Sequence, residues 1–400
     1  MCSMPFNIDP FNISGFIIIL LGANTLILLS ITRNFKPFYN ILFLLFALFY
    51  VAHFIGVLYS TNVLEAQFII ERKLSLIAFP VILFSAPKLA SKQIRVILLS
   101  FIVSCLIVSA VCLVMAAIKY RSAPDLNLFA YHELSKNVGM HAAYLSLYMC
   151  FCIGILLYVY YQEVKTFSVI KKALYAIALI ILFAMVMLLS SRLQILMLIV
   201  GILIYLIYRL GLNKNIYKTI FGVIVIGILL FGLILAFPKN RERFKEAINY
   251  DQQYGLSKKW GEKQMRYLIW SSCLELICEK PLIGWGTGNT QDELEKVYKR
   301  NEYISLTYFD NTRFNAHDQF LETTIALGLV GLFILLAGII SAIRVALRNK
   351  NYLYIIFISA FIISCITESM LERQNGLVFF AFFNSFLLLN NLNKNEKEIK

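Results

Sequence analysis

Long apolar runs alternate with short polar connections along almost the whole chain. Most runs extend over roughly 18 or more residues, the length that a helix needs to cross the apolar interior of a bilayer. Within the runs, polar and apolar positions do not alternate as they would in the strands of a membrane barrel. The pattern therefore predicts an all-α, polytopic integral membrane protein with about 11–12 transmembrane helices. The spans are expected at residues 13–32, 38–59, 74–88, 96–118, 141–161, 173–190, 193–209, 219–237, 317–343, 353–370 and 377–391.

One long polar segment, residues 238–316, interrupts this pattern. Four parts are expected: an N-terminal bundle of about eight spans at 1–237, the loop at 238–316, about three spans at 317–391 and a tail at 392–400. Within the loop, residues 262–280 have apolar positions on one side of a helix and polar positions on the other. The loop is therefore expected to contain amphipathic helices.

Composition agrees with a membrane protein, since 60% of the residues are hydrophobic, 15% are charged and the mean hydropathy is +0.73. The net charge of +14 raises the alternative of a nucleic-acid partner. Basic residues are, however, expected at the cytoplasmic ends of membrane spans, and we expect no nucleic acid. The eight cysteines show no metal-ligand spacing and no disulfide framework.

Basic residues gather in every second connection between the predicted spans. By the positive-inside rule these connections are cytoplasmic, and the long loop 238–316 lies outside, in the periplasm or beyond the cell. Only Ser191 and Arg192 separate the spans 173–190 and 193–209, but two crossings keep the basic clusters on both flanks inside. Arg192 is then expected at the outer membrane–water interface.

Two arginines are candidates for a site on the outer face. The amphipathic helix at 262–280 is expected to lie on the outer leaflet, with Arg266 on its apolar side, four residues before Trp270. The alternative roles are an interfacial side chain that reaches lipid head groups, for Arg266, and a topology anchor, for Arg192. A charge at membrane level commonly marks a functional site, and two guanidinium groups suit the binding of phosphate or pyrophosphate.

His317 stands where the apolar pattern resumes after the loop, and we expect it in the first turn of a helix. The positive end of the helix dipole favours a neutral imidazole, which can act as a general base. Asp318 and Glu322 favour the charged form, so the sequence leaves its protonation open. The alternative is an interfacial capping residue. His141, which opens the fifth span, is a weaker candidate.

A glycine-rich stretch, Gly284–Gly288, precedes His317 in the same loop. Such a stretch can expose backbone N–H groups to an anion. It lacks the lysine and the spacing of a nucleotide-binding P-loop. We expect a tight turn beside a lipid-phosphate site.

Taken together, these features resemble the bacterial O-antigen ligase and O-antigen polymerase family of polytopic membrane glycosyltransferases. The resemblance covers about residues 60 to 345 in order and spacing. It rests on Arg266-x-x-x-Trp270, Pro281-Leu282-Ile283-Gly284-Trp285-Gly286, Asn315-Ala316-His317-Asp318-Gln319-Phe320-Leu321, Gly328-Leu329-Val330-Gly331, Ser191-Arg192 and Arg72-Lys73-Leu74-Ser75-Leu76.

The resemblance implies transfer of a glycan from undecaprenyl pyrophosphate to an acceptor hydroxyl, such as one on lipid A-core, at the periplasmic face of the bacterial inner membrane. It implies no metal, no cofactor and no nucleotide sugar. His317, Arg266 and Arg192 would be catalytic, with the arginines on the pyrophosphate and the histidine on the acceptor hydroxyl. The substrate-binding candidates are Arg72, Lys73, Trp270, Gly286, Asp318, Arg313 and His141.

Several alternatives remain open beside the ligase. A polymerase would use the same donor with a second carrier-linked glycan as acceptor, and a protein O-oligosaccharyltransferase would use a protein. A non-enzymatic lipid-glycan transporter would carry charged residues deep within several spans. Members of the family commonly have twelve spans with both ends cytoplasmic, whereas this chain shows eleven, with its N-terminus outside.

Overall fold

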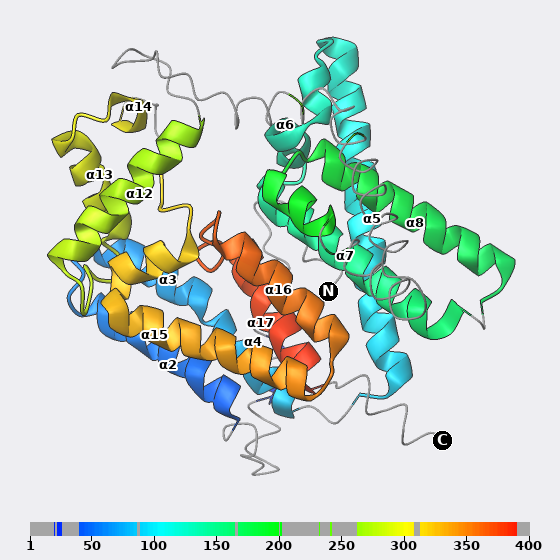
Figure 1. Ribbon diagram of the computed structural model, residues 1–400, viewed down its shortest axis with the longest axis horizontal. Coiled ribbons are helices and arrows are strands. Elements are labelled where there is room, and N and C mark those ends of the chain that lie inside the picture. Colours follow the sequence, from blue (N-terminus) through cyan, green and yellow to red (C-terminus); the bar gives the residue numbers. More distant parts are fainter. Residues whose placement is uncertain are drawn as a thin grey trace, which may run out of the picture. The chain divides into compact units, whose positions relative to one another are not determined.

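The structure is a computed structural model that describes residues 20, 22–25, 40–85, 89–164, 167–199, 201, 232, 241, 262–307 and 313–389. Throughout these ranges the regular elements are helices (Figure 1). Four helices in the described ranges are long and apolar enough to cross a membrane: α5 (Ser91–Ser122), α7 (Ala142–Glu163), α8 (Val169–Leu188) and α15 (Gln319–Arg348). Shorter apolar helices are α2 (Ile41–Val57), α16 (Tyr352–Cys365) and α17 (Gln374–Leu389). The chain is an all-α, multi-pass membrane protein, as its apolar runs predict.

The helices follow the predicted spans closely where the structure describes them. The span expected at 74–88 contains α4 (Ser75–Ser85), with Pro80 inside the helix. Residues 192–199 are helical again after α8, which gives the start of the span expected at 193–209. Most of the spans at 13–32 and 219–237, the loop from 242 to 261 and the tail at 392–400 lie outside the described residues.

The segment at 60–73, expected as a loop, contains the helix α3 (Val63–Lys73). Asn62 caps this helix, because its side chain accepts a hydrogen bond from the Glu65 N–H. Only Leu74 separates α3 from α4. The amphipathic α3 was missed because charged residues interrupt its short apolar pattern.

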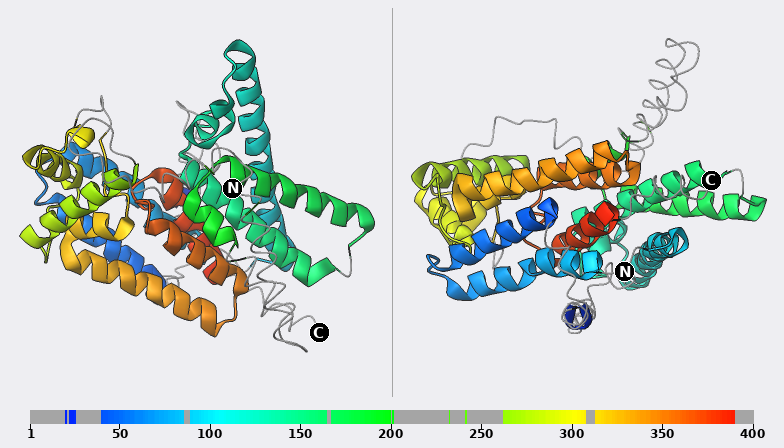
Figure 2. Two further views of the ribbon diagram at one scale, coloured as in Figure 1. Left: turned by 45° about the horizontal axis from the view of Figure 1, so that its top comes forward. Right: turned by 90° about the horizontal axis from the view of Figure 1, so that it is seen from below.

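Contacts divide the chain into two compact units. Of the described residues, those from 98 to 241 form the first unit, and those from 20 to 97 and from 262 to 389 form the second. This grouping cuts across the expected linear parts, since α2, α3 and α4 join the C-terminal helices instead of the first unit. Packing of α15 on α2 and of α17 on α4 produces the second unit (Figure 2).

The first unit contains most of α5, the short helices η2 (Leu126–Phe129) and α6 (Tyr131–Lys136), and the packed pair α7 and α8. His141 is the N-cap of α7, and its Nδ1 accepts a hydrogen bond from the Ala143 N–H at 3.3 Å. After α8, Ser190 adopts a left-handed backbone with φ 49°. This turn is the expected break between the two predicted spans.

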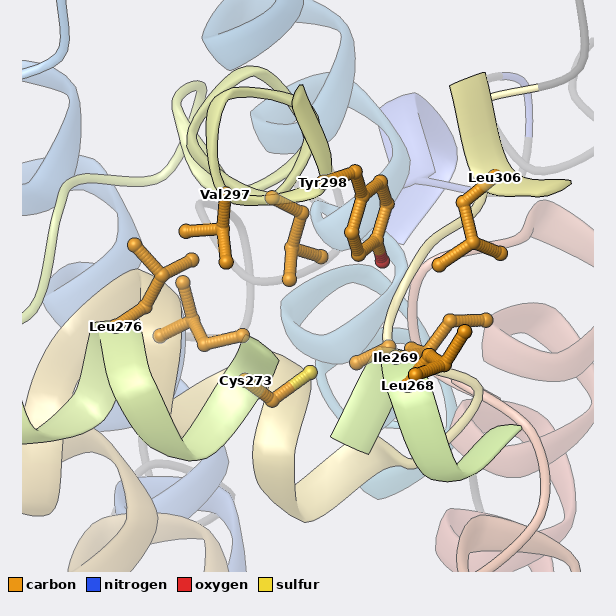
Figure 3. Packing of buried hydrophobic residues seen from close by; sticks show 10 residues of the cluster. Leu268, Ile269, Cys273, Leu276, Val297, Tyr298 and Leu306 are labelled. Carbon is orange, nitrogen blue, oxygen red and sulfur yellow. The ribbon is translucent and has the colours of Figure 1, made fainter. Parts of the chain in front are cut away.

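The second unit also holds the helical part of the polar loop: α12 (Glu262–Glu279), α13 (Thr290–Arg300) and α14 (Ile304–Thr307). Their apolar residues form one buried cluster (Figure 3). Leu268, Ile269, Cys273 and Leu276 of α12 face Val297 and Tyr298 of α13 and Leu306 of α14. The buried face of α12 therefore packs against protein, whereas the sequence analysis expected it to lie on the outer leaflet. The helix α13 is the partner that the sequence did not reveal, because its buried side chains lie along one face.

The glycine-rich stretch fastens this loop to a kink in α15. Gly328 leaves helical geometry there, with φ 66° and ψ −166°. The kink leaves backbone N–H and C=O groups of α15 without partners in the helix, and residues between Pro281 and Gly286 form hydrogen bonds with them. The four bonds are Leu329 N–H to Pro281 O at 2.8 Å, Val330 N–H to Leu282 O at 3.3 Å, Trp285 N–H to Ile325 O at 2.8 Å and Gly286 N–H to Ala326 O at 2.9 Å.

We expect Gly328→Ala to destabilise the protein strongly. A Cβ atom at this position would lie 2.1 Å from the Leu282 carbonyl oxygen, and its φ of +66° strains any residue with a side chain. The expected loss is roughly 1–3 kcal/mol or more of unfolding free energy. Thermal unfolding of the detergent-solubilised protein measures it as a lower melting temperature. Gly201→Ala is the control, since nothing lies within 4 Å of its added Cβ. Equal melting temperatures for the two variants would contradict this account of the kink.

Candidate active site at the turn between α16 and α17

A single carboxylate in the turn after α16 contacts two of the catalytic candidates. Glu368 Oε2 lies 3.4 Å from His317 Nδ1, and Glu368 Oε1 lies 3.6 Å from Arg266 Nη2. The Glu368 side chain is 10% exposed, so water screens these contacts only weakly. The turn therefore joins a cation from α12 to an imidazole that precedes α15.

The sequence pattern alone assigns Glu368 no role. The signal that could have found it is its place in a short polar turn between two apolar spans, on the same predicted side as the long loop. A carboxylate there is unusual enough to suggest function. Its partners are about fifty and one hundred residues away in the chain, so only the fold reveals the contact.

His317 lies before α15. The sequence had predicted it in the first turn of that helix. Asp318 is the N-cap, and its carboxylate accepts hydrogen bonds from the N–H groups of Phe320 and Leu321, both at 2.8 Å. An aspartate in this position begins a helix effectively, so α15 starts at Gln319. His317 itself has a left-handed backbone, with φ 46°. Its backbone N–H donates to Asn315 Oδ1 at 3.1 Å, which supports this strained residue.

Asp318 therefore acts on the site through the backbone. Burial raises the pKa of its carboxyl, although the two amide N–H bonds act in the opposite direction. Its contacts hold the first turn of α15 and thereby the segment that carries His317.

Trp270 connects α12 to the same segment. Its indole Nε1–H donates to the Ala316 carbonyl oxygen at 3.1 Å, one residue before His317. Arg266 lies one turn earlier on α12, on the face predicted from the i, i+4 spacing. The Arg266 side chain is 30% exposed. The hydrogen bond of Trp270 thus holds α12 against the segment before α15, and α12 places Arg266 beside Glu368.

Arg72 and Lys73, at the end of α3, bond the other end of the turn. Arg72 Nη1 donates to the Glu372 carbonyl oxygen at 2.8 Å, and Lys73 Nζ donates to Glu372 Oε1 at 2.7 Å. The turn thus bonds four of the sequence-predicted residues, with Glu368 and Glu372 as acceptors: Arg72, Lys73, Arg266 and His317. Trp270 and Asp318 instead bond the segment 316–321, which carries His317.

Gly286 lies in the stretch that is hydrogen-bonded to the kink of α15, and not at the turn between α16 and α17. The N–H groups of Trp285, Gly286 and Thr287 bond backbone carbonyls, and that of Gly288 bonds Ser60 Oγ at 3.0 Å. The expected exposure of these N–H groups to an anion is therefore absent in this conformation. The stretch acts as a tight turn that fixes the start of α15.

Arg313 bonds α13. Its guanidinium contacts Asp292 Oδ1 and lies 3.4 Å from Glu295 Oε2. Asp292 Oδ2 in turn accepts a hydrogen bond from Asn62 Nδ2 at 2.7 Å, at the start of α3. Arg313 and Asp292 therefore tie the end of the polar loop to α13 and α3.

This tie makes a pH-dependent contribution to stability. Burial raises the pKa of Asp292, but hydrogen bonds from Asn62 and Arg313 and the charges of Arg313 and Lys296 outweigh it, so the pKa lies below its ordinary value. A depressed pKa stabilises the fold above the ordinary aspartate pKa of about 3.9, and the contribution is lost as the pH falls through the folded value. We expect the melting temperature of the wild type to exceed that of Asp292→Asn at neutral pH. The difference should shrink toward zero on acidification, and a difference that is constant with pH would contradict this role.

Arg192 and His141 belong to the first unit. Arg192 opens the helical residues 192–199 after the turn at Ser190. The ring of His141 lies 4.2 Å from that of His132 and 6.0 Å from that of Tyr144, measured between centroids. Their roles in a common site remain predictions.

Comparison with known proteins relates part of the sequence to a family. Residues 177–336 match the family model described as O-antigen ligase. This part of the chain is similar to the O-antigen ligase family. That region includes Arg192, Arg266, Trp270 and His317, so the resemblance seen in these motifs is confirmed.

One relative is a protein of Haemophilus influenzae described as uncharacterized. It is 27% identical over 194 residues, which cover 46% of this chain and 47% of the relative. The match thus spans about half of each protein.

Proposed function

We propose that the protein is an O-antigen ligase. It would transfer a polysaccharide from undecaprenyl pyrophosphate to a hydroxyl of lipid A-core, at the periplasmic face of the inner membrane. The family match supports the reaction class. The observation that carries the proposal is the Glu368 carboxylate, which contacts both the imidazole of His317 and the guanidinium of Arg266.

His317 would be the general base. The contact between Nδ1 and Glu368 favours the tautomer with its proton on Nδ1, which leaves a lone pair on Nε2. Nε2 then takes the proton of the acceptor hydroxyl. The acceptor oxygen forms a bond to the anomeric carbon of the donor as the bond from that carbon to the pyrophosphate oxygen breaks. Undecaprenyl pyrophosphate leaves, and Glu368 stabilises the imidazolium that remains.

Arg266 would neutralise the charge that develops on the departing pyrophosphate. A guanidinium binds phosphate oxygens through paired hydrogen bonds and keeps its charge at every physiological pH. Arg192 would assist in the same task. The energy for transfer would lie in the pyrophosphate linkage, so the reaction would need no nucleotide sugar. The arginines would supply the positive charge that a metal ion supplies in other phosphate sites.

A deletion strain tests the proposed reaction. If the protein is the ligase, the strain accumulates long carrier-linked polymer and makes lipopolysaccharide without O-antigen. Core that carries a single repeat unit would instead assign the protein as the polymerase, which uses the same donor. An unchanged ladder of O-antigen lengths would contradict both. Silver-stained gels of lipopolysaccharide and extraction of the carrier lipid separate these outcomes.

A further inference from the structure

The side chain of Lys73 is buried beside the candidate site. It is 1% exposed, and its ammonium donates to Glu372 Oε1 at 2.7 Å and to the Leu371 carbonyl oxygen at 3.1 Å. The ring of Phe49 lies 5.8 Å from the same Nζ atom. A buried ammonium is very costly unless it is paired and hydrogen-bonded. These contacts satisfy it within the protein.

Residues Leu371 and Glu372 are held from a second side by α15. Gln319 Oε1 accepts the N–H of Leu371 at 2.6 Å, and Gln319 Nε2 donates to Glu372 Oε1 at 3.2 Å. Gln319 is fully buried. The backbone and the carboxylate of this short stretch are therefore fixed between the end of α3 and the start of α15.

The position of the rest of the turn depends on Leu371 and Glu372, because backbone hydrogen bonds within the turn connect its residues. The Met370 N–H donates to the Glu368 carbonyl oxygen at 2.9 Å, and the Glu372 N–H donates to the Ser369 carbonyl oxygen at 3.1 Å. Glu368 lies only four residues before Glu372. A shift at Glu372 would therefore move the carboxylate that faces His317 and Arg266.

We propose that Lys73 is a positioning residue, whose buried ion pair with Glu372 holds the turn so that Glu368 meets His317 and Arg266. Its part in catalysis rests on the proposed function, whereas its part in the fold does not. This role differs from the direct contact with substrate expected from the sequence. Direct contact would require an exposed ammonium, and this one is enclosed and bonded to protein.

The two roles predict different results when both partners are removed. Loss of one partner leaves the other as an uncompensated buried charge, which is strongly destabilising, whereas loss of both is often nearly neutral. Under the positioning role, Lys73→Met and Glu372→Gln are each defective, and the double variant recovers. Under a substrate-binding role, the double variant stays defective because the ammonium is still missing.

The experiment compares the wild type, the two single variants and the double variant, all as full-length protein reconstituted in vesicles. For each, kcat and the donor KM are measured in glycan transfer, and the melting temperature is measured in detergent. Lys136→Met is the control, since it breaks an ion pair with Glu133 in which both side chains are exposed, at 65% and 47%.

We expect Lys73→Met to lower kcat by at least ~10-fold with little change in KM, and the double variant to return within ~3-fold of the wild type. Melting temperatures should show the same pattern, and the Lys136→Met control should match the wild type. A double variant that is stable but as inactive as Lys73→Met would overturn the proposal and place the ammonium on the donor.

Failure of the proposed function would be visible separately. If the wild type transfers no glycan, the melting temperatures still test the ion pair. Destabilised single variants with a recovered double variant would then support the positioning role in the fold alone. Single variants that melt like the wild type would overturn it.

Discussion

Replacing His317 with alanine should abolish glycan transfer while the protein still inserts into the membrane. The variant lacks the nitrogen that takes the proton of the acceptor hydroxyl, and loss of a general base typically costs about 10²–10⁴-fold in rate. The His317 side chain is 25% exposed and, among the described residues, bonds Glu368, so the fold should survive its removal. Transfer from carrier-linked glycan to lipid A-core by purified protein measures the effect.

Chemical rescue provides the control for this prediction. Imidazole added to the buffer can occupy the space that the truncated side chain leaves and should restore part of the rate. An inactive His317→Ala protein that inserts normally but does not respond to imidazole would indicate a role in holding the segment before α15. Transfer at the wild-type rate would remove His317 from the mechanism.

Replacing Glu368 with glutamine should have the second largest effect. The amide has nearly the same shape as the carboxylate, but it carries no charge to stabilise the imidazolium or to pair with Arg266. It can also donate a hydrogen bond to Nδ1, which favours the tautomer with the proton on Nε2 and so blocks the base. A comparable loss of a carboxylate partner lowers kcat by up to roughly 10⁴-fold.

Glu279→Gln is the matched control for this substitution. Glu279 lies on α12 and pairs with Arg300 at 2.9 Å, and its side chain is 38% exposed. Exposed ion pairs contribute little, so this variant should keep the wild-type kcat. Equal rates for Glu368→Gln and the wild type would show that the carboxylate plays no part in the reaction.

The sequence predicted the helices of the membrane better than their ends and connections. Apolar runs gave the class of fold, and the i, i+4 spacing gave the shared face of Arg266 and Trp270. Local geometry beyond periodicity escaped it. The kink at Gly328 depends on backbone partners between Pro281 and Gly286, and the start of α15 depends on the capping bonds of Asp318.

The sequence predicted most residues of the candidate site but not the contacts between them. His317 and Arg266 stood out by their place in the loop and by the family resemblance. Glu368 did not, because its significance arises only when α12, the start of α15 and the turn after α16 come together. Lys73 was expected to bind substrate, and burial against Glu372 suggests another role. Such long-range pairings leave no trace in hydrophobic periodicity.

The most direct test of the central claim is transfer by the purified protein in vesicles. The vesicles would contain a polysaccharide linked to undecaprenyl pyrophosphate, together with lipid A-core and no added divalent metal. The account predicts that the wild type forms the glycan-modified acceptor and releases undecaprenyl pyrophosphate in equal amounts, and that the His317→Ala, Arg266→Ala and Glu368→Gln proteins do not. Transfer by all three variants at the wild-type rate would contradict it.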